Sequence, residues 1–187
     1  MQSIIELDLF FMQQGKVYQT LANLKDRLTR AGIDYAVIGG MALTIHGYVR
    51  ATQDVNLLMT AEGLEEFRSS LVGRGFMLAF AGTTKMFKDA ATGVSVDIIT
   101  AGEFPGDGKP KSVSFPDPAI VSVELDGINV VRLTTLIELK LASGLTAPDR
   151  LKDLADVQEL IRTLLAICTE VSPPFGAFQA GSVSQLI

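Results

Sequence analysis

Apolar positions recur at two spacings along this chain of 187 residues, and the spacing separates the expected helices from the expected strands. Between residues 9 and 31, Leu21, Leu24 and Leu28 recur at helical spacing, and Gly32 is a suitable stop. We therefore predict a helix over residues 9–31. The next segments are predicted in the same way: a short buried strand in "DYAVIGG", a short helix in "MALTIHGY", a second strand in "DVNLLM" and an amphipathic helix in "AEGLEEFRSSLVGRG".

The middle of the chain is rich in short strand-like runs. "FMLAF", "TTKMFKD" and "VSVDIIT" predict three strands, and the Gly- and Pro-rich stretch that follows predicts a surface loop. "IVSVELDGINVVRL" predicts a hairpin with Asp126 and Gly127 in its tight turn.

Two helices are expected near the end. The first should start near Thr135, where Glu138 completes a capping-box pattern, and the second should have Thr146 as its N-cap and Pro148 in its first turn. The residues after Glu170 have no clear period and predict an extended tail.

This order of elements predicts an α+β fold in which a mixed β-sheet is flanked by helices and followed by a helical portion. We expect a core over residues 1–132, a C-terminal helical portion over residues 133–170 and a tail over residues 171–187.

Composition narrows the classes of function. The net charge of −5 does not favour nonspecific binding of nucleic acid. Cys168 is the single cysteine, which excludes an intramolecular disulfide and a cysteine-based zinc site. No signal peptide and no membrane span are expected, because the N-terminus lacks a basic region and no apolar run approaches the length of a span. We therefore expect a cytoplasmic protein.

Two predicted strands carry polar groups that are unusual there. Asp54 and Asn56 lie two residues apart on one strand and therefore point to the same face. Asp97 lies between Val96 and Ile98, where a carboxylate is costly to bury without a partner. If the strands are neighbours, these side chains converge into a site of the kind that Mg²⁺ or Mn²⁺ prefers. Taken alone, Asp54 could also be a solvated turn residue.

The glycine pair Gly39–Gly40 lies just ahead of this strand, between an apolar run and a short helix. Glycines let the backbone approach a ligand closely, and a helix start offers N–H groups to an anion such as a triphosphate. A metal site next to a phosphate cradle is suited to phosphoryl or nucleotidyl transfer.

These residues together resemble the DNA polymerase β-type nucleotidyltransferase superfamily. The family pattern is a glycine pair, a short helix, an Asp-x-Asp strand and a third Asp on a later strand. The matching positions are Gly39, Gly40, Arg50, Thr52, Asp54 and Asp97. The resemblance spans roughly residues 30 to 165 and implies a nucleotidyltransferase fold, a divalent metal and an NTP substrate.

The last part of the resemblance is to bacterial toxin-type members similar to the AbiEii and MenT groups. It lies in "LIELKLASG" and "RLKDLADVQEL", where Lys140 and Asp153 match the Lys and Asp that complete the nucleotide site of those proteins. The residues alone also allow other roles for these side chains. Lys140 could simply cover apolar surface, Asp153 could be surface charge of a helix, and Arg50 could contact a phosphate or pair with a nearby acid.

The chain departs from the family at Asn56, where the resemblance implies an Asp that bridges two metal ions. An amide oxygen can still coordinate a metal but carries no charge, so weaker metal binding and slower transfer are expected. A natural inactive homologue, a substitution made to trap a complex and an active site with another ligand all remain open.

The resulting expectation is Mg-dependent transfer of a nucleoside monophosphate from an NTP to an acceptor, which could be tRNA, protein or a small molecule. Asp54, Asn56 and Asp97 would form the metal site, and Gly39, Gly40, Arg50, Thr52, Lys140 and Asp153 would form the nucleotide site. The alternative is a noncatalytic module of the same fold, such as one member of a toxin–antitoxin pair.

Overall fold

The computed structural model describes residue 10 and residues 13–170, so the predicted tail over residues 171–187 lies outside the described residues. A single seven-stranded sheet runs through the molecule in the order β3-β4-β5-β2-β1-β7-β6. Two pairs, β2 with β5 and β1 with β7, are parallel and the others are antiparallel. The fold is therefore α+β with a mixed sheet, which confirms the fold class predicted from the sequence.

The strands match the predicted runs closely. Their bounds are β1 Ala36–Ile38, β2 Asp54–Met59, β3 Phe76–Leu78, β4 Met86–Asp89, β5 Ser95–Thr100, β6 Ser122–Leu125 and β7 Ile128–Val131. The hairpin turn between β6 and β7 also follows the prediction. Asp126 and Gly127 have φ values of 51° and 73°, the left-handed conformation that a two-residue hairpin turn requires.

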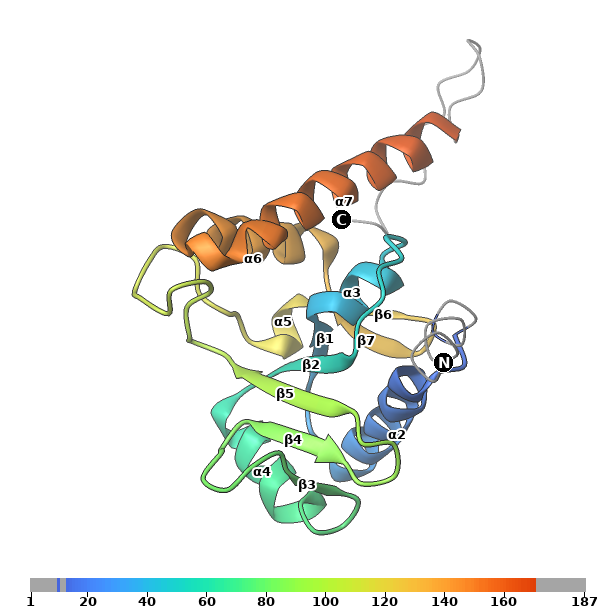
Figure 1. Cartoon of the computed structure of the whole chain (residues 1–187), viewed down its shortest axis with the longest axis vertical. Coiled ribbons are helices and arrows are strands. Elements are labelled where there is room, and N and C mark those ends of the chain that lie inside the picture. The colour runs from blue at the N-terminus through green and yellow to red at the C-terminus, as the bar shows by residue number, and fades with distance from the viewer. Residues whose placement is uncertain (1–9, 11–12, 171–187) are drawn as a thin grey trace.

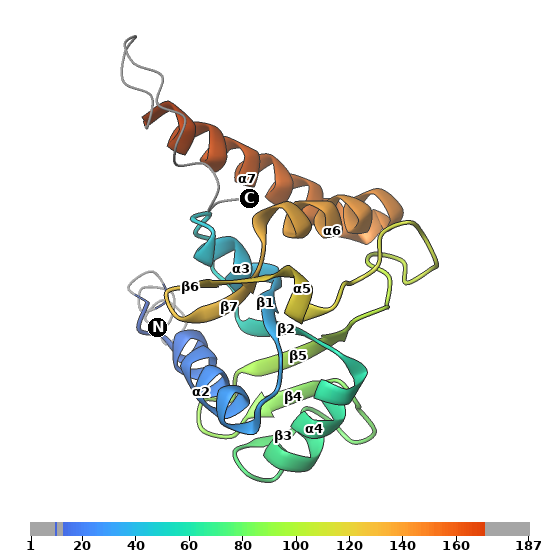
Figure 2. The same ribbon diagram turned by 180° about the vertical axis from the view of Figure 1, so that it is seen from behind.

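Helices lie on both sides of this sheet. Their bounds are α2 Lys16–Ala31, α3 Gly39–Ile45, α4 Ala61–Leu71, α5 Pro118–Val121, α6 Leu133–Thr146, the 3₁₀ turn η1 Pro148–Arg150 and α7 Leu151–Glu170. Figures 1 and 2 show α6 and α7 together at one end of the molecule and α2 and α4 toward the other. None of the described helices is long and apolar enough to cross a membrane.

One apolar core joins these layers. Leu24 and Leu28 of α2 and Phe67 of α4 are fully buried against the strands. Leu136 of α6 and Leu160 of α7 belong to the same cluster. The C-terminal helices are therefore packed onto the sheet through apolar side chains, and this packing fixes the position of one wall of the cleft described below.

Several predicted helix ends differ from the structure: α4 ends at Leu71, before the predicted stop at Gly75, and α3 already begins at Gly39. The helix predicted over residues 9–31 is interrupted: Phe10 is helical, residues 13–15 are not, and α2 begins at Lys16 with Gly15 as its N-cap. Residues 9, 11 and 12 lie outside the described residues. The first C-terminal helix begins at Leu133, not near Thr135, and its N-cap Arg132 makes no side-chain cap. Thr146 is not an N-cap: its hydroxyl donates to the Ala142 carbonyl at 2.7 Å, within the last turn of α6.

Candidate functional site

The floor of the candidate site is formed by the parallel strands β2 and β5. Along β2 the half-buried Asp54 and Asn56 alternate with Val55 and Leu57, which are fully buried. Asn56 lies directly opposite Asp97 in the β2–β5 register. The three polar side chains therefore share one face of the sheet, as the two-residue period of a strand dictates.

Asp54 has a hydrogen-bond donor on each carboxylate oxygen. The Thr52 hydroxyl donates to Oδ1, and Nδ2 of Asn56 donates to Oδ2 at 3.0 Å. The amide at position 56 thus turns its donor group toward the neighbouring carboxylate. An aspartate at that position could not donate this bond when ionised, so Asn56 replaces a repulsion between like charges with an attraction.

Asp97 differs from Asp54 in its hydrogen bonding. Its Oδ1 is buried and has no hydrogen-bond partner among the described residues. Burial, and secondarily the negative charge of Asp54, raises the pKa of the Asp97 carboxyl. A buried carboxylate oxygen without a partner, close to a second carboxylate, is a site that a cation would stabilise.

The glycine pair packs directly against the floor. A Cβ on Gly39, which has a φ of 73°, would lie 2.9 Å from Nδ2 of Asn56. A Cβ on Gly40 would lie 2.7 Å from Oγ1 of Thr52. Glycine is therefore needed here so that α3 can start against the side chains that hold Asp54, a reason that sequence reasoning did not identify.

The opposite wall carries a network of ion pairs on α6 and α7. Nζ of Lys140 donates to Oδ1 of Asp153 at 2.7 Å and to Oδ2 of Asp156 at 2.8 Å. Nη1 of Arg50 donates to both oxygens of Asp156, at 2.6 and 2.7 Å. The Ser143 hydroxyl completes the network by donating to Oδ2 of Asp153 at 2.6 Å. Arg50 therefore ties the loop before β2 to α7, whose Asp156 also binds Lys140 of α6.

The two carboxylates of this wall belong to one helix face. Asp153 and Asp156 are three residues apart on α7, which places them on the same side of the helix. Burial alone would raise the pKa of Asp153, but the hydrogen bonds from Lys140 and Ser143 outweigh it and hold the pKa below its usual value. Asp156, which is only 3% exposed, was missed by sequence reasoning although its spacing from Asp153 could have indicated it.

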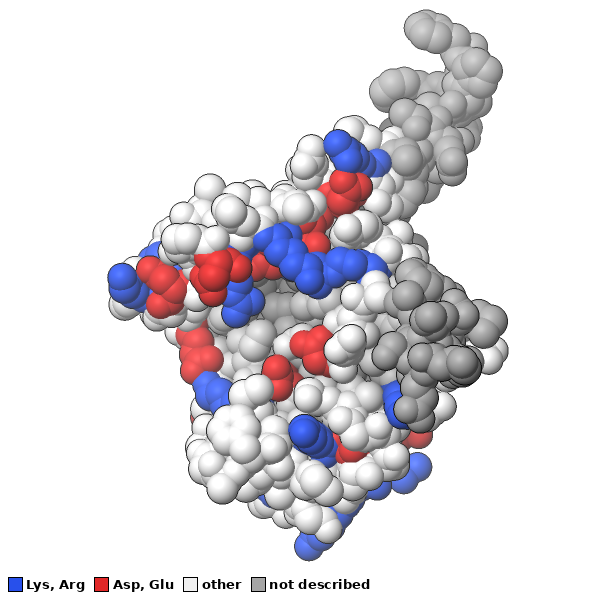
Figure 3. Space-filling view, viewed as in Figure 1, with Lys and Arg blue, Asp and Glu red and all other residues white. Residues whose placement is uncertain are grey.

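Between the floor and this wall lies a cleft of about 660 Å³, visible as a hollow in Figure 3. All nine residues predicted for the site line it: Gly39, Gly40, Arg50, Thr52, Asp54, Asn56, Asp97, Lys140 and Asp153. The lining also contains Arg150 and Lys152, which sequence reasoning did not assign to the site.

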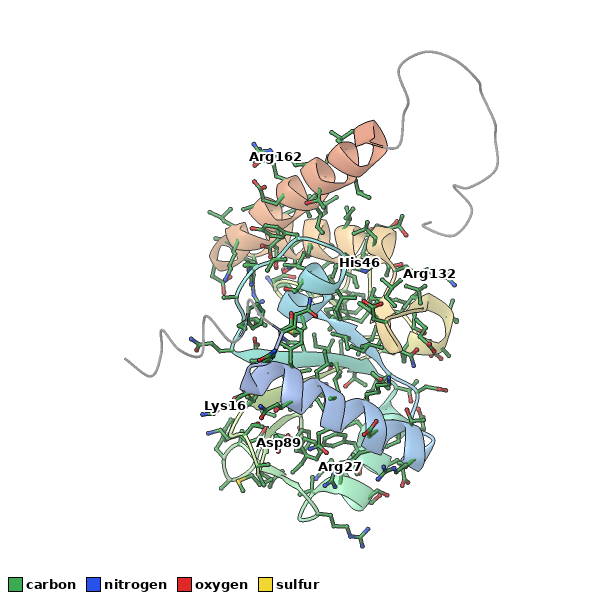
Figure 4. The ribbon with its side chains drawn as sticks, turned by 90° about the vertical axis from the view of Figure 1, so that its right-hand side faces the viewer. Lys16, Arg27, His46, Asp89, Arg132 and Arg162 are labelled. Carbon is green, nitrogen blue, oxygen red and sulfur yellow. The ribbon has the colours of Figure 1, made fainter. Side chains whose placement is uncertain are left out.

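His46 lies outside the lining of this cleft. It ends α3, next to the β6–β7 hairpin (Figure 4), and its Nε2–H donates to the Val131 carbonyl at 2.7 Å. Burial lowers its pKa. The neutral ring therefore joins α3 to β7, a structural contact.

The donor set of the floor fits a hard divalent cation with an incomplete set of ligands. No group of three or more His, Cys, Asp and Glu side chains that could hold a metal occurs in the described part of the chain. Asp54, Asp97 and the Asn56 amide supply oxygen atoms, and Mg²⁺ is commonly held by one or two carboxylates together with phosphate oxygens of a substrate. The unpartnered Oδ1 of Asp97 is the observation that favours this fit.

Comparison with known proteins gives structural matches only. No family model and no curated protein matches the sequence. A protein of Thermotoga maritima assigned as a nucleotidyltransferase is similar in structure with a TM-score of 0.51 and 19% identity, over 78% of this chain and 92% of that one. An antigenic nucleotidyltransferase-like protein of Paracoccidioides brasiliensis gives 0.51 and 15%, over 79% of this chain and 76% of its own.

A third match is ANT(2″)-Ia, whose structure contains adenylyl-2″-tobramycin. It gives a TM-score of 0.50 and 14% identity, over 81% of this chain and 94% of that one. Identities this low show the fold alone. The cleft therefore lies in a protein with the nucleotidyltransferase fold.

Proposed function

We propose that this protein transfers a nucleoside monophosphate from an NTP to a hydroxyl group of an acceptor. The observation that carries the proposal is the convergence of Asp54 and Asp97 on neighbouring strands, with one carboxylate oxygen of Asp97 buried and unpartnered. In this proposal residues 1–132 supply the floor of the site and residues 133–170 supply its second wall.

Asp54 and Asp97 would hold Mg²⁺ or Mn²⁺, with the amide oxygen of Asn56 as a weaker third ligand. The bound ion would supply neutralisation of phosphate charge and activation of the acceptor hydroxyl. Asn56 would have to turn its amide to offer oxygen, because its Nδ2 now donates to Asp54. This rearrangement is one physical reason to expect slow transfer.

The residues of the cleft would carry out the chemistry around the α-phosphorus. The acceptor oxygen would form a bond to this phosphorus as the bond to the β-phosphate oxygen breaks, and pyrophosphate would leave. Asp97 would accept the hydroxyl proton. Gly39 and Gly40 would let the phosphates approach the backbone closely.

The nucleotide would lie against the walls that carry Arg50, Thr52, Lys140 and Asp153, all of which line the cleft. Arg50 and Lys140 carry positive charge, and Thr52 holds Asp54 in place. Isothermal titration with Mg²⁺ and each of the four NTPs tests this arrangement. Binding of one NTP is expected, and no binding of any of them would overturn the enzymatic proposal.

The proposal extends to the class of acceptor and to a toxin-like role. The resemblance of the C-terminal helices to the AbiEii and MenT groups supports a role in a toxin–antitoxin pair. The protein should be incubated with each labelled NTP and either total tRNA, total protein or aminoglycosides. The labelled product identifies the acceptor class, and label in the tRNA or protein fraction supports the toxin-like branch over a small-molecule transferase such as ANT(2″)-Ia.

A second candidate function is a noncatalytic module that keeps the fold and binds a nucleotide or a partner protein. It is favoured by Asn56, whose donor contact satisfies Asp54 without a cation. Asn56→Asp separates the two candidates. A large gain in transfer means that the rest of the site is competent, whereas no gain in a variant that binds metal favours the module.

A further inference from the structure

Four basic side chains line the cleft, and they fall into two pairs with different surroundings. Arg50 and Lys140 are engaged by acidic side chains, whereas Arg150 and Lys152 make no side-chain hydrogen bond or ion pair within the described part of the chain. Both Arg150 and Lys152 are exposed. The pairs therefore differ in how readily they can contact an anion.

Arg50 and Lys140 are both held by acidic side chains, although the buried Nε of Arg50 has no hydrogen-bond partner in the described residues. The Lys140 side chain is 10% exposed and bonded to both Asp153 and Asp156, and the Arg50 side chain is 24% exposed and bonded twice to Asp156. Removing a cation from such a pair leaves a carboxylate buried without compensation, which is strongly unfavourable. This cost opposes any movement of either cation away from its carboxylates toward a phosphate.

Arg150 and Lys152 face no such cost. Arg150 is the last residue of η1 and Lys152 is the second residue of α7, and both line the cleft. Figure 3 shows basic side chains, with acidic ones among them, along the helical side of the hollow, and acidic side chains across it. Among the lining carboxylates without an ion pair in the described residues, Asp54 and Asp97 lie on the floor, and Asp149 lies beside Arg150 in η1.

Apart from Asp149, the unpaired charges are separated in a way that matches the charge distribution of a metal-bound triphosphate. The unpaired carboxylates of the floor are complementary to the metal, and the unpaired cations of the wall are complementary to the phosphate oxygens that keep negative charge. The ion-paired cations add no net charge to the wall, because Asp153 and Asp156 neutralise Arg50 and Lys140.

We propose that Arg150 and Lys152 bind the triphosphate directly, and that Arg50 and Lys140 are positioning residues which hold α7 in place through Asp156 and Asp153. The inference rests on the proposed function, since it names the phosphate contacts of that same site. Arg150 offers a planar group suited to two phosphate oxygens, and Lys152 offers a point charge.

The test compares two double variants of equal charge change. One carries Arg150→Gln and Lys152→Gln; the control carries Lys109→Gln and Arg162→Gln. Lys109 is 80% exposed in the loop after β5, and Arg162 projects outward from α7 (Figure 4). Titration calorimetry with Mg²⁺ and inorganic tripolyphosphate measures binding without reference to the base, and titration with the NTPs follows.

We expect the cleft variant to bind tripolyphosphate and NTP about 30- to 100-fold more weakly than wild type, since each lost charge-assisted contact contributes about a factor of ten at an exposed position. Its affinity for the corresponding monophosphate should fall much less, and its melting temperature should match that of the control. A merely structural role would lower the melting temperature and would not distinguish between triphosphate and monophosphate.

Two negative results are distinguishable. If wild type binds an NTP and the cleft variant binds it equally well, the assignment of Arg150 and Lys152 is wrong while the proposed function stands. If wild type binds neither tripolyphosphate nor any NTP, the proposed function and this inference fail together.

Discussion

Asp156 offers the sharpest test of how the cleft is assembled, because it accepts hydrogen bonds from two cations that come from different parts of the chain. Arg50 precedes β2 and Lys140 lies on α6, and both donate to the Asp156 carboxylate at 2.6–2.8 Å. The change Asp156→Asn keeps the size of the side chain and removes its charge. Both cations then lose a charged partner, and Lys140 keeps only Asp153.

The expected cost follows from the burial of the three side chains. Breaking a buried ion pair by neutralising one partner destabilises a protein by about 3–5 kcal/mol. Asp156 is 4% exposed as a side chain, but Arg50 is 24% exposed and can recover part of its hydration. We therefore expect the lower end, about 3 kcal/mol, which for a domain of this size corresponds to a fall in melting temperature of about 6–12 °C.

Urea denaturation followed by circular dichroism measures this free energy of unfolding. Asp149→Asn is the matched control: Asp149 is exposed and has no ion pair in the described structure, so its change should cost less than about 0.5 kcal/mol. A cycle that adds Arg50→Gln should show strong coupling with Asp156→Asn. A loss below about 1 kcal/mol for Asp156→Asn, or additive effects in the cycle, would refute the reasoning.

Three further predictions concern the floor and α3. In cation-free buffer Asp97→Asn should raise the free energy of unfolding by about 1 kcal/mol, because it removes the repulsion between Asp97 and Asp54; thermal melts in EDTA and in Mg²⁺ check this, and the variant should lose any stabilisation by Mg²⁺. Gly40→Ala should destabilise the fold although alanine favours helices by about 1 kcal/mol, because the new Cβ displaces Thr52; urea melts that show a stabilised variant would contradict this. The lowered pKa of His46 makes the unfolded chain bind a proton first as pH falls below about 6.5, so stability should decrease from pH 7 toward pH 5 in wild type and less in His46→Gln.

Sequence patterns predicted the strands well because each strand carries its own signal. In β2 the alternation of polar and apolar residues directly reflects one open and one buried face. The helix ends were less predictable because they depend on contacts elsewhere in the fold. Thr146 has the side chain of an N-cap, yet it lies at the end of α6, where its hydroxyl bonds back to the preceding turn.

The site residues also divide into those with a local sequence signal and those that depend on distant contacts. Asp54, Asn56 and Asp97 could be grouped from strand geometry alone, and the glycine pair from its place before a short helix. Asp156 has only its spacing from Asp153 as a local signal, because its partner Arg50 is 106 residues away in the sequence and nothing local marks a charge on α7 as buried. Its pairing exists only once the C-terminal helices pack on the core.

The contact between Asn56 and Asp54 also bears on how the protein would behave when metal is scarce. Because the amide donates to the carboxylate, Asp54 is stabilised from within the chain, without a cation. Stability and activity would then favour different residues at position 56. An amide would keep the protein folded when a chelator removes the metal. A carboxylate would speed the reaction but would make the fold depend on bound metal.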